Sequence, residues 1–98
     1  GQRINDIADE YQITYTPNDA GSNYVAPNHN AVYTLAVTKN GNPYSVDVTF
    51  SWQIYNALGE PRTSGTSSTV TVTTDDCLVG TGDNAYYSDC DVQVTADF

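Results

Sequence analysis

Residues 31–55, AVYTLAVTKNGNPYSVDVTFSWQIY, constrain the fold most, because two runs in this stretch alternate between apolar and polar side chains. A period of two predicts a strand with one face in a core and the other toward solvent. The predicted core faces carry Tyr33, Leu35 and Val37 in the first run, and Val46, Val48, Phe50, Trp52 and Ile54 in the second.

The residues between these runs predict a tight turn. Asn40 and Gly41 tolerate positive φ, and Pro43 cannot donate a ladder hydrogen bond, so we expect pairing to stop there. The two runs are therefore predicted to form a central hairpin. Its register is strongly set, since a slip of one residue would turn Phe50 and Trp52 toward solvent.

Alternation elsewhere predicts further strands and an all-β fold. Tyr11, Ile13 and Tyr15 alternate with polar residues up to Pro17, and the runs 69–74 and 91–98 alternate in the same way. Short edge strands are expected at Tyr24-Val25 and at residues 61–64. We predict an antiparallel β-sandwich of about six or seven strands, with a small closed barrel as the alternative.

One domain accounts for most of the chain. Ninety-eight residues suffice for a single hydrophobic core, which we assign to residues 11–98. Residues 1–10 are polar apart from Ile4, Ile7 and Ala8, and are expected to be a linker or short N-terminal segment, with one helical turn as the other option.

The charge balance argues against two classes of partner. The chain carries 12 acidic and 3 basic residues, for a formal net charge of -9. Nucleic acid requires a basic patch to replace its counterions, and an anionic lipid surface attracts basic segments. No apolar run is long enough to span a bilayer. We therefore expect no nucleic-acid partner and no direct membrane insertion.

Cys77 and Cys90 are predicted to form a disulfide. They have 12 residues between them and no neighbouring His or further Cys, which excludes the usual zinc patterns. Closing such a loop stabilises a fold by roughly 3 kcal/mol. A disulfide implies an oxidising compartment or the outside of a cell or virion. Two reduced thiols that lie near each other are the alternative. Because Cys77 and Val72 have opposite parity, a bulge or break is expected near Asp75-Asp76.

Part of the chain resembles a known family. The runs Tyr33-Thr34-Leu35, Asn40-Gly41-Asn42-Pro43 and Val48-Thr49-Phe50, followed by residues 69–74 and a last strand at 92–96, resemble bacterial Ig-like domains of the intimin and invasin type. A Cys-bounded loop, residues 75–90, stands where that family has a short Gly turn. The resemblance implies an Ig-like sandwich that serves as an extracellular, non-enzymatic module. Similar domains also occur on phage virions.

Loop 75–90 and the residue that follows it contain the candidate metal ligands. A calcium ion prefers six to eight oxygen ligands, which a loop held at both ends could preorganise. No EF-hand spacing is present, and a solvated acidic loop without metal is the alternative. Calcium here would be structural, and no other cofactor is expected. The candidate ligands are Asp75, Asp76, Asp89 and Asp91, with Asp83 and Asn84 as further oxygen donors.

The same loop contains the candidate binding residues, Tyr86, Tyr87, Asp83 and Asn84. Exposed aromatic side chains beside polar ones stack on sugars or act as hot spots for proteins. The alternative is that these tyrosines cap the ends of the core, as Tyr44 and Tyr55 could do near strand ends.

Catalytic residues are scarce. A single histidine, His29, and two paired cysteines leave no base for nucleophilic chemistry, so no enzyme is expected. We expect an extracellular module, on a cell surface or virion exterior, that binds a cell-surface glycan or protein through loop 75–90. The alternative is a structural spacer or a capsid or tail component that assembles with neighbouring domains or copies of itself.

Overall fold

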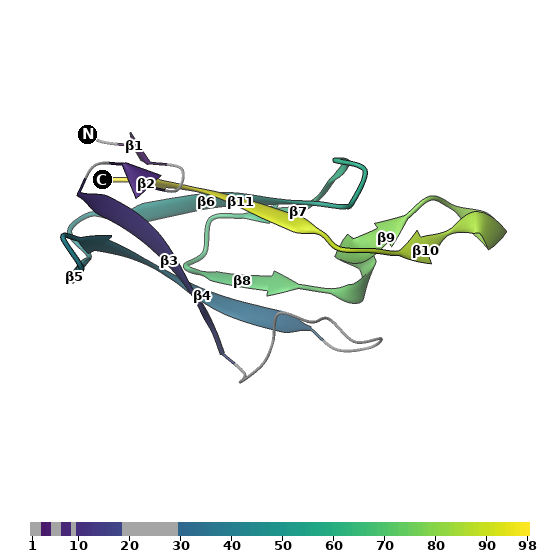
Figure 1. The fold of residues 1–98 in the computed structure, drawn as a ribbon, viewed down its shortest axis with the longest axis horizontal. Coiled ribbons are helices and arrows are strands. Elements are labelled where there is room, and N and C mark those ends of the chain that lie inside the picture. Colours follow the sequence, from purple (N-terminus) through teal and green to yellow (C-terminus); the bar gives the residue numbers. More distant parts are fainter. Residues whose placement is uncertain (1–2, 5–6, 9, 19–29) are drawn as a thin grey trace.

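The computed structural model describes residues 3–4, 7–8, 10–18 and 30–98. These residues form two main antiparallel sheets, a small two-stranded sheet and two 3-10 helices (Figure 1). The first sheet has the order β1 (Arg3–Ile4), β11 (Asp91–Asp97), β6 (Thr49–Tyr55) and β7 (Pro61–Gly65). The second has the order β2 (Ile7–Ala8), β3 (Tyr11–Pro17), β4 (Ala31–Lys39) and β5 (Asn42–Tyr44), and β8 (Thr69–Val72) also pairs with β4. The small sheet is β9 (Leu78–Val79) with β10 (Tyr86–Tyr87), and the helices are η1 (Thr74–Cys77) and η2 (Gly82–Asn84).

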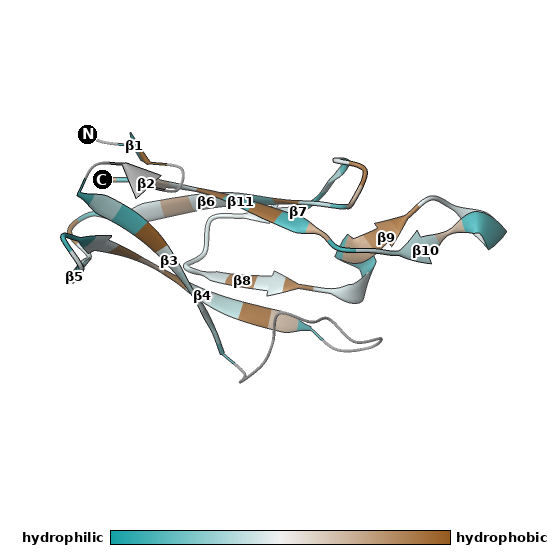
Figure 2. Cartoon of the chain, in the orientation of Figure 1, coloured by the Kyte–Doolittle hydropathy of each residue, from teal (hydrophilic) through white to brown (hydrophobic). Residues whose placement is uncertain are grey.

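The predicted all-β sandwich is confirmed, because the inner faces of the two main sheets share one hydrophobic core. In Figure 2, hydrophobic residues, in brown, recur along the strands of both sheets. The strands number eleven in the described residues, more than predicted, since four of them are only two residues long. The buried core side chains are Ile4, Ile54, Val94 and Ala96 from the first sheet and Tyr11, Ile13, Ala31, Leu35, Val37, Val70 and Val72 from the second.

The predicted central hairpin is wrong. The turn at Asn40 (φ 50) and Gly41 (φ 83) forms as expected, but it joins β4 to the short strand β5. Pro43 lies within β5, opposite Thr38, and does not end the pairing. Proline is tolerated there because β5 is an edge strand. The chain then crosses to the other sheet, where β6 pairs with β11 and β7.

This crossing also corrects the predicted position of Val46, which is 62% exposed and does not share the core face. Asp47 adopts a positive φ of 52°, so the backbone turns there and β6 begins only at Thr49. From that point the predicted alternation is recovered. Phe50 and Trp52 are half-buried and pack against the core, and Ile54 is fully buried.

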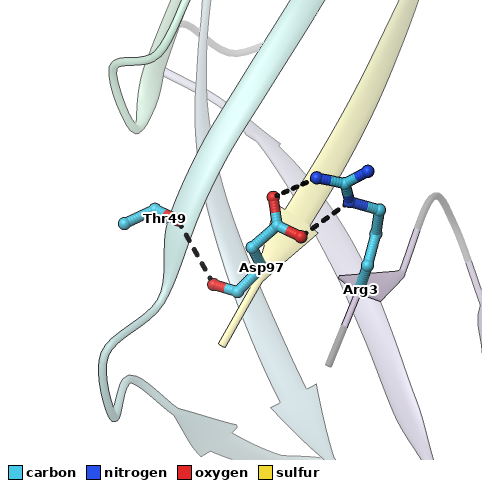
Figure 3. A network of polar contacts seen from close by, with 3 residues as sticks. All are labelled: Arg3, Thr49 and Asp97. Carbon is cyan, nitrogen blue, oxygen red and sulfur yellow. Dashed lines mark hydrogen bonds and ion pairs between the residues drawn. The ribbon is translucent and has the colours of Figure 1, made fainter. Parts of the chain in front are cut away.

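The N-terminal segment adds one short strand to each main sheet, β1 to the first and β2 to the second. Residues 3–4 and 7–8 are extended, not helical, and Ile4 is in the core. β1 pairs with the end of β11, where the Arg3 guanidinium contacts the Asp97 carboxylate with Nε 2.7 Å from Oδ1 (Figure 3). The Thr49 hydroxyl donates to the backbone carbonyl of Asp97, at 3.4 Å. The strand expected at Tyr24-Val25, and His29, lie outside the described residues.

The molecule is elongated, with principal extents of 48 × 27 × 19 Å. β1 and the end of β11 lie at one end, and the β9–β10 pair lies at the other (Figure 1). Three aromatic rings close the first of these ends: Tyr11 lies 5.5 Å from Tyr44 and 4.7 Å from Phe98, between centroids. The Lys39 ammonium lies over the Tyr11 ring, 5.5 Å from its centroid.

Candidate recognition site

Residues 78–89, which we call the arm, extend beyond the sandwich at the end away from β1 (Figure 1). The arm contains β9, η2 and β10, with Tyr86 opposite Val79 and Tyr87 opposite Leu78. Gly80 adopts a φ of 83°, which a residue with a side chain rarely does, so the chain can reverse there. The loop that the sequence predicted at residues 75–90 therefore contains a short two-stranded ribbon.

The four predicted binding residues all lie on this arm. Tyr86 is 53% exposed and Tyr87 is 58% exposed, and Asp83 and Asn84 are exposed within η2. Successive residues of a strand point to opposite faces, so the ribbon presents one tyrosine on each face. The alternative interpretation, that tyrosines cap the core, applies instead to Tyr11 and Tyr44 at the far end.

The segment just before the arm, the helix η1, is held to the sandwich by Asp76, which is 2% exposed. We call this attachment the root of the arm. Its Oδ1 accepts hydrogen bonds from the backbone N–H and hydroxyl of Thr63, at 3.2 and 2.6 Å. Its Oδ2 accepts from the backbone N–H and hydroxyl of Thr73, at 2.8 and 3.0 Å. One carboxylate thus joins η1 to β7 and to the end of β8.

Burial of Asp76 by itself favours the neutral acid and would raise the pKa of the carboxyl group. The hydrogen bonds from Thr63 and Thr73 stabilise the charged form and outweigh this effect, so the pKa lies below its ordinary value. Asp76 is therefore a carboxylate at neutral pH, and its charge is compensated by four donors.

A second buried polar side chain, Asn56, holds the arm from another side. Its amide nitrogen donates to the backbone carbonyl of Leu78 at 3.0 Å and to Glu60 Oε1 at 2.9 Å. Its amide oxygen accepts from the backbone N–H groups of Leu58 and Glu60. Asn56 thus organises the turn between β6 and β7 and attaches that turn to the first residue of the arm.

The two cysteines lie on either side of the point where the arm leaves the sandwich. Cys77 ends η1 and Cys90 precedes β11, and their Sγ atoms are 3.2 Å apart. Both residues are half-buried and pack against the core as free thiols. Burial and the contact with Cys77 raise the pKa of Cys90 to about 12. The predicted disulfide stays a prediction, and the break expected near Asp75-Asp76 is confirmed as the helix η1.

The calcium ligands proposed from the sequence are not gathered into one cluster. Asp75, Asp89 and Asp91 are exposed, whereas Asp76 is buried with both oxygens occupied by threonine donors. Within residues 3–4, 7–8, 10–18 and 30–98, no three His, Cys, Asp or Glu side chains are placed to hold a metal ion. Calcium binding and its alternative, a solvated acidic loop without metal, both stay predictions.

The part of the chain that the structure describes contains no helix long and apolar enough to cross a membrane.

The side-chain hydrogen bonds that hold the arm in place were not predicted from the sequence. Asp76 was predicted as a metal ligand, and no role was predicted for Asn56, Thr63 or Thr73. One signal was available, since a threonine followed three residues later by an acidic residue is typical of a helix-start capping pair, as Thr73 and Asp76 are. The contact with Thr63 had no such signal, because it depends on the placement of β7.

A comparison of the chain with models of protein families, with curated proteins and with solved structures finds no match.

Proposed function

We propose that this domain is a non-enzymatic binding module, displayed on the exterior of a cell or virion, that recognises a protein partner through the arm. The observation that carries the proposal is the exposure of Tyr86 and Tyr87, at 53% and 58%, on a ribbon beyond the sandwich. Tyrosine is enriched among the residues that dominate binding energy at protein interfaces, because it buries a large area and loses little conformational entropy.

The arrangement of the two rings favours a protein over a sugar as the partner. A sugar ring can stack on a single aromatic ring, but two tyrosines can contact the same sugar only if they share a face. Tyr86 and Tyr87 are consecutive in β10 and point to opposite faces. A ribbon with an aromatic ring on each side suits insertion into a groove of a partner, where both faces become buried.

The root of the arm supports the same function. Asp76 and Asn56 are buried and fully hydrogen-bonded, and both attach the arm to the sandwich. An arm held in this way loses less conformational freedom on binding than a free loop would, so more of the interface energy appears as affinity.

The position of the arm relative to the chain ends favours recognition over a spacer role. β1 and the end of β11 lie together, at the end opposite the arm (Figure 1). A repeat in a stalk transmits the chain from one end of the domain to the other. Here a neighbouring segment on either side would attach at the same end, and the arm would point away from it.

The test uses arrays of extracellular proteins and of glycans, probed with the labelled domain. The arm variant is Tyr86→Ser/Tyr87→Ser. The matched control is Val46→Ser/Leu58→Ser, which also removes two exposed apolar side chains, 62% and 66% exposed, but from turns outside the arm. We expect a protein ligand whose affinity falls at least about tenfold in the arm variant, because a hot spot contributes about 2 kcal/mol or more, and remains unchanged in the control.

Other outcomes would change the proposal in defined ways. A ligand that binds the arm variant as tightly as the wild type would contradict the role of the arm. Ligands found only on the glycan array would replace the partner class with a sugar. Binding of the domain to itself, seen also as a discrete oligomer in sedimentation, would favour the alternative of self-assembly into a larger structure.

A further inference from the structure

The chain leaves the sandwich at Cys77 and returns to it at Cys90, and we call these two positions the neck of the arm. The inference drawn from the neck does not depend on which partner the arm binds. The two Sγ atoms are 3.2 Å apart, and both cysteines pack against the core. A backbone hydrogen bond from Ser88 N–H to the carbonyl of Cys77, 3.0 Å long, already holds the two sides of the neck together. A disulfide requires about 2.05 Å between sulfur atoms. The two sulfurs are therefore only about 1 Å farther apart than in a disulfide.

We propose that Cys77 and Cys90 are a redox clasp, which closes to an intramolecular disulfide by exchange with a small-molecule disulfide and locks the arm against the sandwich. The structure describes the open, dithiol form. Closing the clasp would join the end of η1 covalently to the start of β11.

The reaction balances with glutathione disulfide as the oxidant. The thiolate of Cys77 attacks one sulfur of glutathione disulfide, which breaks that bond, forms a mixed disulfide and releases one glutathione. Cys90 then loses its proton to solvent and attacks the Sγ of Cys77, and a second glutathione leaves. Two protein thiols are oxidised, and one glutathione disulfide is reduced to two glutathione thiols.

The folded structure should promote this reaction strongly. Folding and disulfide formation are linked equilibria, so a disulfide that stabilises the folded chain must also form more readily in the folded chain than in the unfolded one. For a loop of this size, the chain-entropy estimate corresponds to a factor of about 100. The neck geometry supports that full factor, because the native structure already brings the two sulfurs together.

The clasp is tested by titrating the domain with mixtures of reduced and oxidised glutathione. The oxidised fraction is read from intact mass, with native buffer compared against concentrated urea. We expect a species two hydrogen atoms lighter, and a midpoint in native buffer shifted about a hundredfold toward more reducing mixtures relative to urea. In the oxidised protein, amide hydrogen exchange in residues 78–89 should slow relative to the dithiol form.

Three results would overturn the inference. The first is a midpoint that is the same in native buffer and in urea. The second is accumulation of glutathione adducts, or persistence of both free thiols, without the lighter species. The third is unchanged hydrogen exchange in the arm after oxidation, which would remove the locking role. The variants Cys77→Ser and Cys90→Ser serve as mass controls, because each can form only a glutathione adduct.

Discussion

The buried carboxylate of Asp76 offers the sharpest test of how the arm is held. In the variant Asp76→Asn, one carboxylate oxygen becomes an amide nitrogen, whichever way the amide is turned. That nitrogen then points at a backbone N–H, either of Thr63 or of Thr73, which are now 3.2 and 2.8 Å from the oxygens. A hydroxyl can rotate to accept a hydrogen bond, but a backbone N–H cannot. One backbone donor that faces the buried side chain of residue 76 is therefore left without an acceptor.

The magnitude follows from these contacts. An unsatisfied buried donor costs about 1–3 kcal/mol, and the bonds that remain lose the strength that a charged acceptor gives them. We expect the free energy of unfolding of Asp76→Asn to fall by about 2–4 kcal/mol in urea denaturation. In a domain of this size, such a loss lowers the melting temperature by about 10–25 °C.

The neighbouring residue provides the matched control. Asp75 is exposed, and its contacts are made by its backbone carbonyl, which accepts from Arg62 Nη2 at 2.8 Å and from the backbone N–H of Leu78. The same chemical change, Asp75→Asn, should alter stability by less than about 0.5 kcal/mol. If Asp76→Asn were as stable as the wild type, or if both variants lost stability equally, the role assigned to the Asp76 carboxylate would be refuted.

Three further results are expected. The folded-state pKa of Asp76 lies below its ordinary value of 3.8, so the carboxylate stabilises the fold above pH 3.8, and this contribution is lost as pH falls through the folded-state pKa. The free energies of unfolding of wild type and Asp76→Asn, measured in urea, should therefore become equal in acid. A difference that stays constant with pH would contradict this. Gly65→Ala should destabilise by about 1–3 kcal/mol and change the tryptophan fluorescence, because a Cβ would lie 2.5 Å from the Trp52 ring; an unperturbed spectrum would argue otherwise. Adding calcium and then a chelator should leave the melting temperature unchanged, because both carboxylate oxygens of Asp76 already accept hydrogen bonds from threonines. A melting temperature that rises saturably with calcium, and does not rise in Asp89→Asn, would restore the metal site.

Local alternation was sufficient to predict the faces of most strands. In β4 and β8, Leu35, Val37, Val70 and Val72 are all buried as expected, because a period of two directly reports which side faces the core. The parity change before Cys77 likewise predicted a break, which is η1. These predictions need only the residues of one segment.

The pairing between segments could not be predicted in the same way. A hairpin turn at Asn40-Gly41 is compatible with any strand that follows, and the strand that does follow, β5, has no apolar alternation to reveal it. The positive φ at Asp47, which sends the chain to the other sheet, is one that aspartate tolerates better than most residues but adopts only occasionally, so its identity alone does not mark the turn. Tertiary packing decides both features.

In the candidate site, too, the local features were predicted and the contacts between distant segments were not. Tyr86 and Tyr87 were predicted as binding residues because two adjacent aromatics in a polar loop are recognisable in the sequence. The hydrogen bonds of Asp76 were not predicted, because a carboxylate in an acidic loop looks the same in the sequence whether it binds a metal or accepts hydrogen bonds from Thr63, 13 positions away.

The cation over the aromatic cluster has a practical consequence for measuring binding. Lys39 is the only lysine of the chain, and it lies over Tyr11, which contacts Phe98 at the end of the molecule away from the arm. Coupling through its side-chain amine would attach the domain to a sensor surface in one orientation, with Tyr86 and Tyr87 pointing into solution. The sequence thus provides its own site for oriented immobilisation.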